Sequence, residues 1–326
     1  MPEALPKTYR AWTWVAGEDP LALVLATRPM PRPGPGEVIV RNAAISLNPV
    51  DWKVLGGLGW QRGHVPGVDG AGTVVKIGPD VDPAWLESRV AYHQSLQSHG
   101  SFAQYTPVGA HALMRVPDAL DLALAASMPC PALTAWRALA KLPPGGNQRL
   151  LVSGAGGAVG NYLVQLAVQL DWRVSVMCNI RHRERLAGVG AVDWIAGPLE
   201  QGSEIGSPRF TAAIDMVGPE HAARLHPGLK ANGHLVCIQG RVPDWPSPAF
   251  GRALSLHEVA LGALHQHGDV TDWMFQTAAG EDLFAQVAAK TLAPEPLRLG
   301  TFEELPQMLD ALRNRDFSGK PVIMLD

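Results

Sequence analysis

Glycine is concentrated in the stretch SGAGGAVG, which runs from Ser153 to Gly160 and leads at once into an apolar, helix-like segment. Three of these glycines are spaced as Gly154-x-x-Gly157-x-x-Gly160, directly after the strand candidate RLLVS. Between a strand and a helix, this spacing allows a tight turn, the approach of backbone N–H groups to a pyrophosphate, and close packing of the helix on the strand. The pattern therefore predicts a dinucleotide site at the helix N-terminus, with a purely structural turn as the alternative.

The residues after the second predicted strand distinguish the two nicotinamide dinucleotides. In units that bind NAD, an Asp or Glu about 20 residues after the fingerprint holds the ribose 2′-hydroxyl. Here the strand candidate WRVSVMC ends at Cys178 and Asn179, and Arg181 and Arg183 follow. A carboxylate would repel the 2′-phosphate of NADP, whereas a guanidinium pairs with it through charge-assisted hydrogen bonds. The sequence therefore predicts NADP(H), while Arg185 is expected to lie on a solvated helix face.

The bulk composition indicates a globular protein of two domains. The chain has 326 residues, more than the roughly 250–300 at which single cores stop growing. Hydrophobic residues make up 47% of it, which supplies ample core, and the net charge of −3 without a basic block argues against a nucleic-acid partner. We expect no membrane span and no secretion signal. Three widely spaced cysteines, without a CxxC pair, suit a reducing cytoplasm.

The spacing of apolar residues divides the chain into two kinds of structure. Residues 1–125 contain short β-rich runs between Gly/Pro turns, typical of a partly open barrel. From 126 to 265, strand and helix candidates alternate, which predicts an α/β domain with a doubly wound parallel sheet. A closing strand, KPVIML, is expected to rejoin the β-rich part. The predicted helices are residues 125–142, 158–170, 181–190, 220–229 and 302–314.

Several motifs, in order, resemble the medium-chain dehydrogenase/reductase superfamily, and within it the zinc-independent quinone oxidoreductases of the zeta-crystallin type. They are GEVIVRNAAISLNPVDWKVLGG, VPGVDGAGTVVKIG, GSFAQY, MPCPALTAWRAL, VSGAGGAVGNYLVQLA, AAIDMVG, NGHLVCIQG and GKPVIML. The resemblance covers nearly the whole chain. It implies a GroES-like β-barrel catalytic domain, residues 1–125 and 266–326, interrupted by a Rossmann NADP(H)-binding domain, residues 126–265, with the active site in the cleft between them.

The resemblance also implies where a catalytic zinc would be held, because zinc-dependent members use Cys, His and Cys. Asn48 and Val68 stand at the first two of these positions, and only Cys130 remains. One thiol cannot build a tetrahedral zinc site, so we expect no metal and take Cys130 as a small buried filler. The conceivable replacement ligands are His64, His93 and His99.

Polar residues around the motif LNPVDWK are the candidates for catalysis. Asn48 corresponds to the family's cleft Asn and is expected to hydrogen-bond nicotinamide, ribose or a substrate oxygen, with a turn role as the alternative. Asp51 could orient cleft groups or cap the next turn, and Lys53 could stabilise or protonate a substrate oxygen, unless it is a plain surface lysine. Asp69 is expected to be structural. The residues predicted to bind the cofactor are Asn48, Thr134, Gly154, Gly157, Ala158, Val159, Gly160, Asn179, Arg181, Arg183, Val217, Gln239 and Gly240.

Without zinc, substrates that spread incoming hydride charge themselves are favoured. The prediction is an NADPH-dependent reductase of quinones or other conjugated carbonyls. The alternatives are a 2-alkenal, enone or enoyl-thioester reductase, and a non-catalytic NADPH-binding protein. Gly197 stands where relatives often have a Tyr beside adenine, and Trp60 could belong to a lid or to an ordinary loop. The segment LSLHEVALGALH could be an edge strand that pairs two copies in a homodimer.

Overall fold

The chain folds into two compact units in the computed structural model, which describes residues 5–325. Unit 1 comprises residues 1–130 and 262–326, and unit 2 comprises residues 131–261. Each unit has its own sheets and its own buried apolar cluster. The assignment of catalysis to one unit and of cofactor binding to the other stays a prediction.

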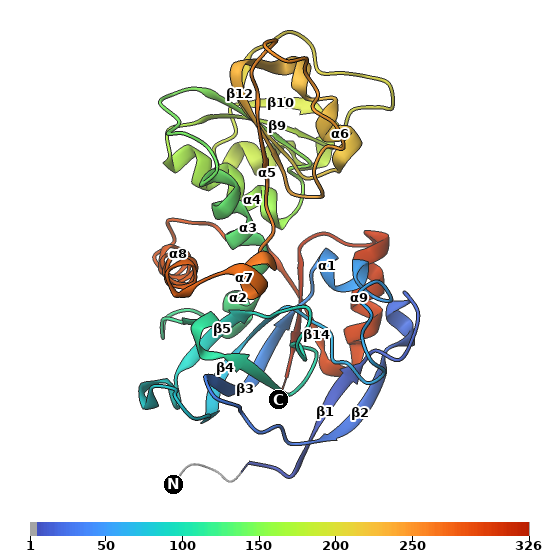
Figure 1. Ribbon diagram of the computed structural model, residues 1–326, viewed down its shortest axis with the longest axis vertical. Coiled ribbons are helices and arrows are strands. Elements are labelled where there is room, and N and C mark those ends of the chain that lie inside the picture. The colour runs from blue at the N-terminus through green and yellow to red at the C-terminus, as the bar shows by residue number, and fades with distance from the viewer. Residues whose placement is uncertain (1–4, 326) are drawn as a thin grey trace. The chain divides into compact units, whose positions relative to one another are not determined.

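Unit 2 is built on a six-stranded sheet in which every neighbouring pair of strands is parallel (Figure 1). The strand order is β10-β9-β8-β11-β12-β13. Counted along the chain from β8, this is the order 3-2-1-4-5-6 of the doubly wound Rossmann fold, which confirms the predicted fold class. The strands are β8 (Arg149–Ser153), β9 (Arg173–Cys178), β10 (Asp193–Ala196), β11 (Phe210–Asp215), β12 (Leu229–Cys237) and β13 (Ser255–Glu258).

Helices of unit 2 cover both faces of this sheet. Helix α4 (Ala158–Gln169) packs on β8 and β9, and α6 (Pro219–Ala223) packs on β12, on the other side of the sheet (Figure 1). The connections between parallel strands are right-handed. Because the strand order runs from the centre of the sheet toward both edges, the helices of the two halves lie on opposite faces. Helix α5 (Arg183–Gly188) and α6 are both shorter than predicted. Beyond α6, Pro227 lacks an N–H, and a 3-10 turn over His226–Gly228 replaces the predicted last turns.

The single helix predicted over residues 125–142 is wrong, because the structure has two helices there. Helix α2 (Leu122–Ser127) starts at Asp121, whose side chain accepts a hydrogen bond from the Ala123 N–H at 2.8 Å. Helix α3 (Pro129–Leu139) begins immediately after Met128. Proline has no N–H to donate to the preceding turn but is tolerated in the first turn of a helix, so Pro129 ends one helix and starts the next.

Unit 1 contains a seven-stranded sheet and a separate antiparallel hairpin of β1 and β2. The order along the larger sheet is β14-β15-β3-β4-β5-β7, and β6 pairs with β3. The closing strand β15 pairs antiparallel with β3, as the sequence predicted. The strands are β1 (Thr8–Thr13), β2 (Val24–Pro29), β3 (Glu37–Ser46), β4 (Asp69–Ile77), β5 (Arg89–His93), β6 (Tyr105–Gly109), β7 (Leu113–Arg115), β14 (Leu297–Thr301) and β15 (Lys320–Met324).

One long helix of unit 1, α8 (Val270–Ala288), escaped the sequence analysis. The buried residues on its inner face follow the helical period, but Val270, Met274 and Phe275 are exposed, and these apolar residues on the outer face obscure that period in the sequence.

None of the helices between residues 5 and 325 combines the length and apolar composition that a membrane span requires. The other helices are α1 (Pro49–Lys53), α7 (Ala263–His267) and α9 (Leu305–Asn314), which packs beside α1 (Figure 1).

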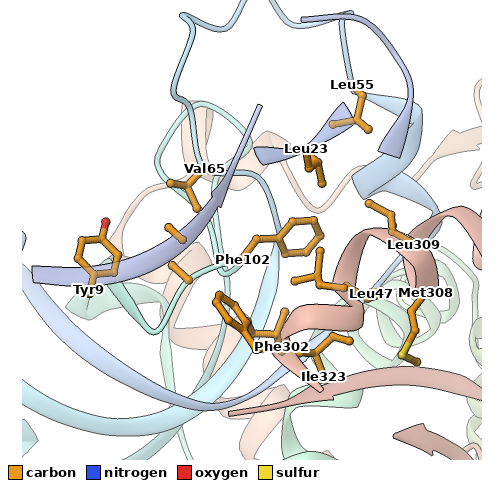
Figure 2. Close-up of a cluster of buried hydrophobic side chains, with 14 residues drawn as sticks. Tyr9, Leu23, Leu47, Leu55, Val65, Phe102, Phe302, Met308, Leu309 and Ile323 are labelled. Atoms are coloured by element: carbon orange, nitrogen blue, oxygen red, sulfur yellow. The ribbon is translucent and has the colours of Figure 1, made fainter. Parts of the chain in front are cut away.

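The apolar core of unit 1 joins segments that are far apart in the chain. Phe102 is completely buried in it, between residues of the N-terminal hairpin and of α9 (Figure 2). Gly67 must be glycine, because it has φ +101° and a Cβ there would overlap the Phe102 ring. The other labelled members of this cluster are Tyr9, Leu23, Leu47, Leu55, Val65, Phe302, Met308, Leu309 and Ile323.

Replacing the central ring of this cluster should destabilise unit 1 strongly. We expect Phe102→Ala to lower its free energy of unfolding by about 3–5 kcal/mol, because the buried ring is lost and a cavity remains. Urea denaturation followed by tryptophan fluorescence measures the change. The matched control is Leu21→Ala, at a side chain that is 51% exposed, with an expected change within about 0.5 kcal/mol. Equal losses in both variants would contradict the assignment of Phe102 to the core.

Candidate functional site

The glycine fingerprint lies at the turn between β8 and α4, as the sequence predicted. Strand β8 ends at Ser153 and α4 begins at Ala158, with Gly157 at the N-cap. Gly154 has φ +76°, and a Cβ at Gly160 would overlap the Ala155 carbonyl, so both positions require glycine. No atom lies within 4 Å of the position a Gly157 Cβ would take. A helix start with open space at its N-cap fits the phosphates of a dinucleotide.

A second turn lies beside the fingerprint, after β11. Strands β8 and β11 are neighbours at the point where the strand order reverses, which is where ligands bind in doubly wound sheets. A Cβ at Gly154 would lie 3.2 Å from Val217 Cγ2, so the two turns are in contact. Val217 is 40% exposed there, and its predicted contact with the cofactor stays a prediction.

The turn after β11 is held by a buried pair that the sequence analysis missed. Asp215 Oδ2 accepts hydrogen bonds from the N–H groups of Val217 (3.0 Å) and Gly218 (2.9 Å). Its Oδ1 lies 2.6 Å from His221 Nδ1, and His221 Nε2 accepts from the Leu199 N–H. These partners fix the histidine as a neutral donor to Asp215. The available signal was an Asp at a strand end with a His six residues later.

The end of β9 is basic in the structure. Asn179 accepts a hydrogen bond from the Arg181 N–H at 3.1 Å, and the side chains of Arg181 and Arg183 are exposed. The expectation that Arg185 is merely solvated is wrong. Arg185 is half-buried and donates to Asn161 Oδ1 (3.0 Å) and to the Gly156 carbonyl (2.9 Å). It therefore connects α5 to the fingerprint turn.

The remaining predicted cofactor residues of unit 2 are distributed around the sheet. Gln239 and Gly240 lie exposed just after β12, and Gly240 has φ +95°. Thr134 is buried on α3. At Gly197, which follows β10, a Cβ would overlap the Met177 side chain, so a larger residue there would require that side chain to move. The cofactor contacts of all these residues stay predictions.

In unit 1, Asn48 lies at the centre of a buried polar cluster. Its Nδ2 donates to Asp69 Oδ2 at 2.9 Å, and its Oδ1 accepts from Lys320 Nζ at 2.5 Å. Asn48, Asp69 and Lys320 are all at least 95% buried. Asp69 Oδ2 also accepts from the Cys130 N–H, a contact that fits the expected structural role of this carboxylate. The sequence analysis did not single out Lys320, which stands at the start of β15.

Asp51 acts as a cap on the first turn of α1, one of its two predicted roles. Its Oδ2 accepts from the Asn48 N–H (2.7 Å) and its Oδ1 from the Val68 N–H (3.1 Å). Burial raises the pKa of Asp51 to about 7; its hydrogen bond to the Asn48 N–H and the Lys320 charge oppose this rise. A carboxyl with such a pKa changes its protonation state near neutral pH.

Lys53, the third catalytic candidate, is exposed at the end of α1. Its Nζ lies 5.6 Å from the centre of the Trp52 ring. Partial desolvation and the charge of Arg315 lower the pKa of Lys53. This direction suits a proton donor, but the catalytic roles of Asn48, Asp51 and Lys53 stay predictions.

Cys130 is not the buried filler that the sequence suggested. Its side chain is partly exposed, and ligand atoms of Asp69, His93 and Cys130 all lie within 4.8 Å of one another. Such a group could hold a metal ion, although Asn48 and Val68 occupy the positions of two family zinc ligands. Against this, Asp69 Oδ1 already lies 2.8 Å from His93 Nδ1, and Oδ2 has two hydrogen-bond donors.

The other two histidines considered as ligands lie elsewhere in unit 1. The His64 ring stacks on Trp60 with 4.3 Å between centroids, and His99 lies beside Arg28. Burial lowers the pKa of His64 to about 4, helped by the charges of His99 and Arg28. Trp60 donates its indole N–H to the Leu96 carbonyl at 2.8 Å. These contacts fit an ordinary packed loop.

Comparison with known proteins places the chain in a family. The model of the alcohol dehydrogenase GroES-like domain matches residues 34–118. Trans-enoyl reductase milB of Cordyceps militaris is 31% identical over 98% of this chain and 99% of its own length. Quinone-oxidoreductase QR1 of Triphysaria versicolor is 30% identical over 64% of this chain and 68% of its own length. The chain belongs to the quinone oxidoreductase-like family of the medium-chain dehydrogenase/reductase superfamily.

Membership of this family confirms that the chain is an oxidoreductase with a GroES-like part and a Rossmann part. Among solved structures, mycobacterial Rv1454c, complexed with NADPH, superposes with a TM-score of 0.80. It is 23% identical and covers 97% of this chain and 100% of its own. At this identity the likeness concerns the fold alone.

The Asp51 carboxyl should make the stability of unit 1 depend on pH. Its pKa is raised from 3.8 to about 7 in the folded chain, so folding binds a proton and stability falls as pH rises between these values. We expect the free energy of unfolding to fall with pH more steeply in the wild type than in Asp51→Asn. The expected difference in slope is up to about 1 kcal/mol per pH unit.

Urea unfolding at pH 5, 6, 7 and 8 measures this difference. Asp316→Asn is the control, because Asp316 is exposed and its variant should follow the wild type. Parallel profiles for Asp51→Asn and the wild type would show that the carboxyl keeps its ordinary pKa on folding.

Proposed function

We propose that the protein is an NADPH-dependent reductase that transfers hydride to quinones or other conjugated carbonyls without zinc. The observation that carries this proposal is the fingerprint turn at the switch point of the unit 2 sheet, beside a strand end that carries Asn179, Arg181 and Arg183 in place of an acidic residue. Supporting it, QR1 is named a quinone oxidoreductase, and Rv1454c is described in complex with NADPH.

Different residues of the chain would bind different parts of the cofactor. The first N–H groups of α4 would meet the pyrophosphate, with Gly154, Gly157, Ala158, Val159 and Gly160 forming the turn. Arg181 and Arg183 would pair with the 2′-phosphate. Backbone groups at Val217, Gln239 and Gly240, together with Thr134, would line the rest of the cofactor's path.

Chemistry at the substrate requires stabilisation of a negative oxygen. When bound, NADPH supplies a hydride. Quinones and conjugated carbonyls delocalise the incoming charge, so amide and ammonium donors suffice where other members of the superfamily use zinc. Asn48 would orient the reacting groups, and Lys53, with its lowered pKa, would stabilise or protonate the oxygen.

The second candidate is a reductase of 2-alkenals, enones or enoyl thioesters. The relative that matches over nearly its full length, milB, is named a trans-enoyl reductase, and this observation favours the alternative. A non-catalytic NADPH-binding protein is the third candidate.

We also propose a cytoplasmic homodimer, since β13 is an edge strand of the unit 2 sheet and could pair with a second copy.

Removing the two exposed guanidinium groups should weaken NADPH selectively. We expect Arg181→Ala/Arg183→Ala to raise the Kd for NADPH about 10- to 100-fold, as charge-assisted hydrogen bonds to the 2′-phosphate are lost, and to leave the Kd for NADH unchanged. Nicotinamide fluorescence titration measures both. Arg173→Ala, at the other end of β9 and also exposed, is the matched control. Equal weakening of NADPH and NADH would contradict the assigned role.

Steady-state assays decide among the functions. NADPH oxidation is followed with 1,4-benzoquinone, a naphthoquinone, 2-alkenals and crotonyl thioester, before and after dialysis against a chelator. We expect the highest kcat/KM with a quinone, and no loss on chelation, because hydride acceptance does not require a Lewis acid here. Preference for the crotonyl thioester would support the second candidate. Tight NADPH binding without any turnover would support the third, and activity lost to the chelator would overturn zinc independence.

A further inference from the structure

The Lys320 side chain is a buried cation that no predicted role accounts for. Its Nζ donates to the Leu47 carbonyl at 2.9 Å and to Asn48 Oδ1 at 2.5 Å. The residue is only 5% exposed, and lysine is almost never buried unless it is paired. Burial lowers the pKa of Lys320, while electrostatic interactions with Asp69, Cys130, Asp51 and Glu295 oppose this shift.

Lys320 and Asp69 together determine which way the Asn48 amide faces. A protonated lysine amino group can only donate hydrogen bonds, and an ionised carboxylate can only accept them. The amide oxygen must therefore face Lys320, and the amide nitrogen must face Asp69. The opposite orientation would set two donors against each other and two acceptors against each other, both in a buried place.

The same contacts place a buried cation against Asn48, which by resemblance stands where zinc-dependent relatives have a ligand cysteine. Asp69 is buried beside Asn48, Cys130 and His93, and both of its oxygens have hydrogen-bond partners without an ion. The positive charge beside this carboxylate comes from Lys320, through Asn48. A buried carboxylate needs such compensation, since an unpaired buried charge is strongly destabilising.

We propose that Lys320 is a positioning residue for the reaction, acting through Asn48: its amino group fixes the asparagine amide in one orientation and takes the place of a bound metal ion. The inference rests on the proposed reductase function. It adds a residue from the closing strand β15 to the cluster around Asn48 and Asp69. Without the lysine, the amide is free to flip and present the wrong group.

The test compares Lys320→Met, Asn48→Ala and the double variant. Lys320→Met keeps the length and apolar stem but removes the donor. We expect it to lower kcat with NADPH and a quinone by roughly 10- to 100-fold, with the Kd for NADPH within about threefold of the wild type. The double variant should lose no more than the worse single variant, because both changes disable one unit. Lys320→Arg, which keeps donors and charge, should recover most of the lost kcat.

Two controls make the outcome specific. Lys76→Met removes an exposed lysine from β4 of the same sheet and should leave kcat unchanged. Metal analysis of the purified wild type should find no stoichiometric metal ion. A wild-type kcat in folded Lys320→Met, or losses that multiply in the double variant, would overturn the proposal. A stoichiometric metal ion would overturn it too, and so would Lys320 variants that all fail to fold while Asn48→Ala folds.

Thermal unfolding of the wild type, Lys320→Met, Asn48→Ala and the double variant separates this inference from the proposed function. If the wild type reduces no substrate, the function fails, but the coupling between Lys320 and Asn48 is still measured. The loss of Tm in the double variant should then be clearly smaller than the sum of the two single losses, because each single change leaves a partner buried without its hydrogen bond. Additive losses would refute the coupling, whatever the enzyme reduces.

Discussion

The carboxylate of Asp69 is completely buried, and everything around the LNPVD turn is arranged to make that burial possible. An ionised carboxylate in the interior must be hydrogen-bonded and balanced in charge. The backbone of Cys130, the amide of Asn48 and the ring of His93 supply the donors. Together with Asp69, these groups come from four separate segments of the chain, so satisfying one charge fixes their positions relative to each other.

The polar cluster around Asn48 orders its side chains by hydrogen bonding. A metal ion would organise side chains by its preferred geometry. In this chain a network of donors and acceptors does so, with Lys320 as the buried cation and Asn48 between it and Asp69. Such a network specifies one arrangement only while every member is satisfied. It is correspondingly sensitive to any change that removes a donor.

In unit 2, the predicted ligand-binding residues are positioned mainly by backbone conformation. Its fingerprint turn depends on backbone conformation and close approach, which glycine permits at Gly154 and Gly160. The adjoining turn is held by the buried Asp215–His221 pair, and Arg185 ties α5 to the fingerprint. Backbone N–H groups are thus presented by a rigid frame, while the exposed arginines Arg181 and Arg183 remain able to adapt to a ligand.

The sequence by itself determined the features that depend on local spacing: the glycine fingerprint, the βα alternation, the basic end of β9 and the return of β15 to the first sheet. It could not show that Pro129 divides a helix, or that α8 exists, because competing local signals were of similar strength. Only the tertiary structure decided which distant polar groups meet. Lys320 lies 272 residues from Asn48, and a hydrogen bond between them leaves no periodic signal, since it depends on how β15 pairs with β3.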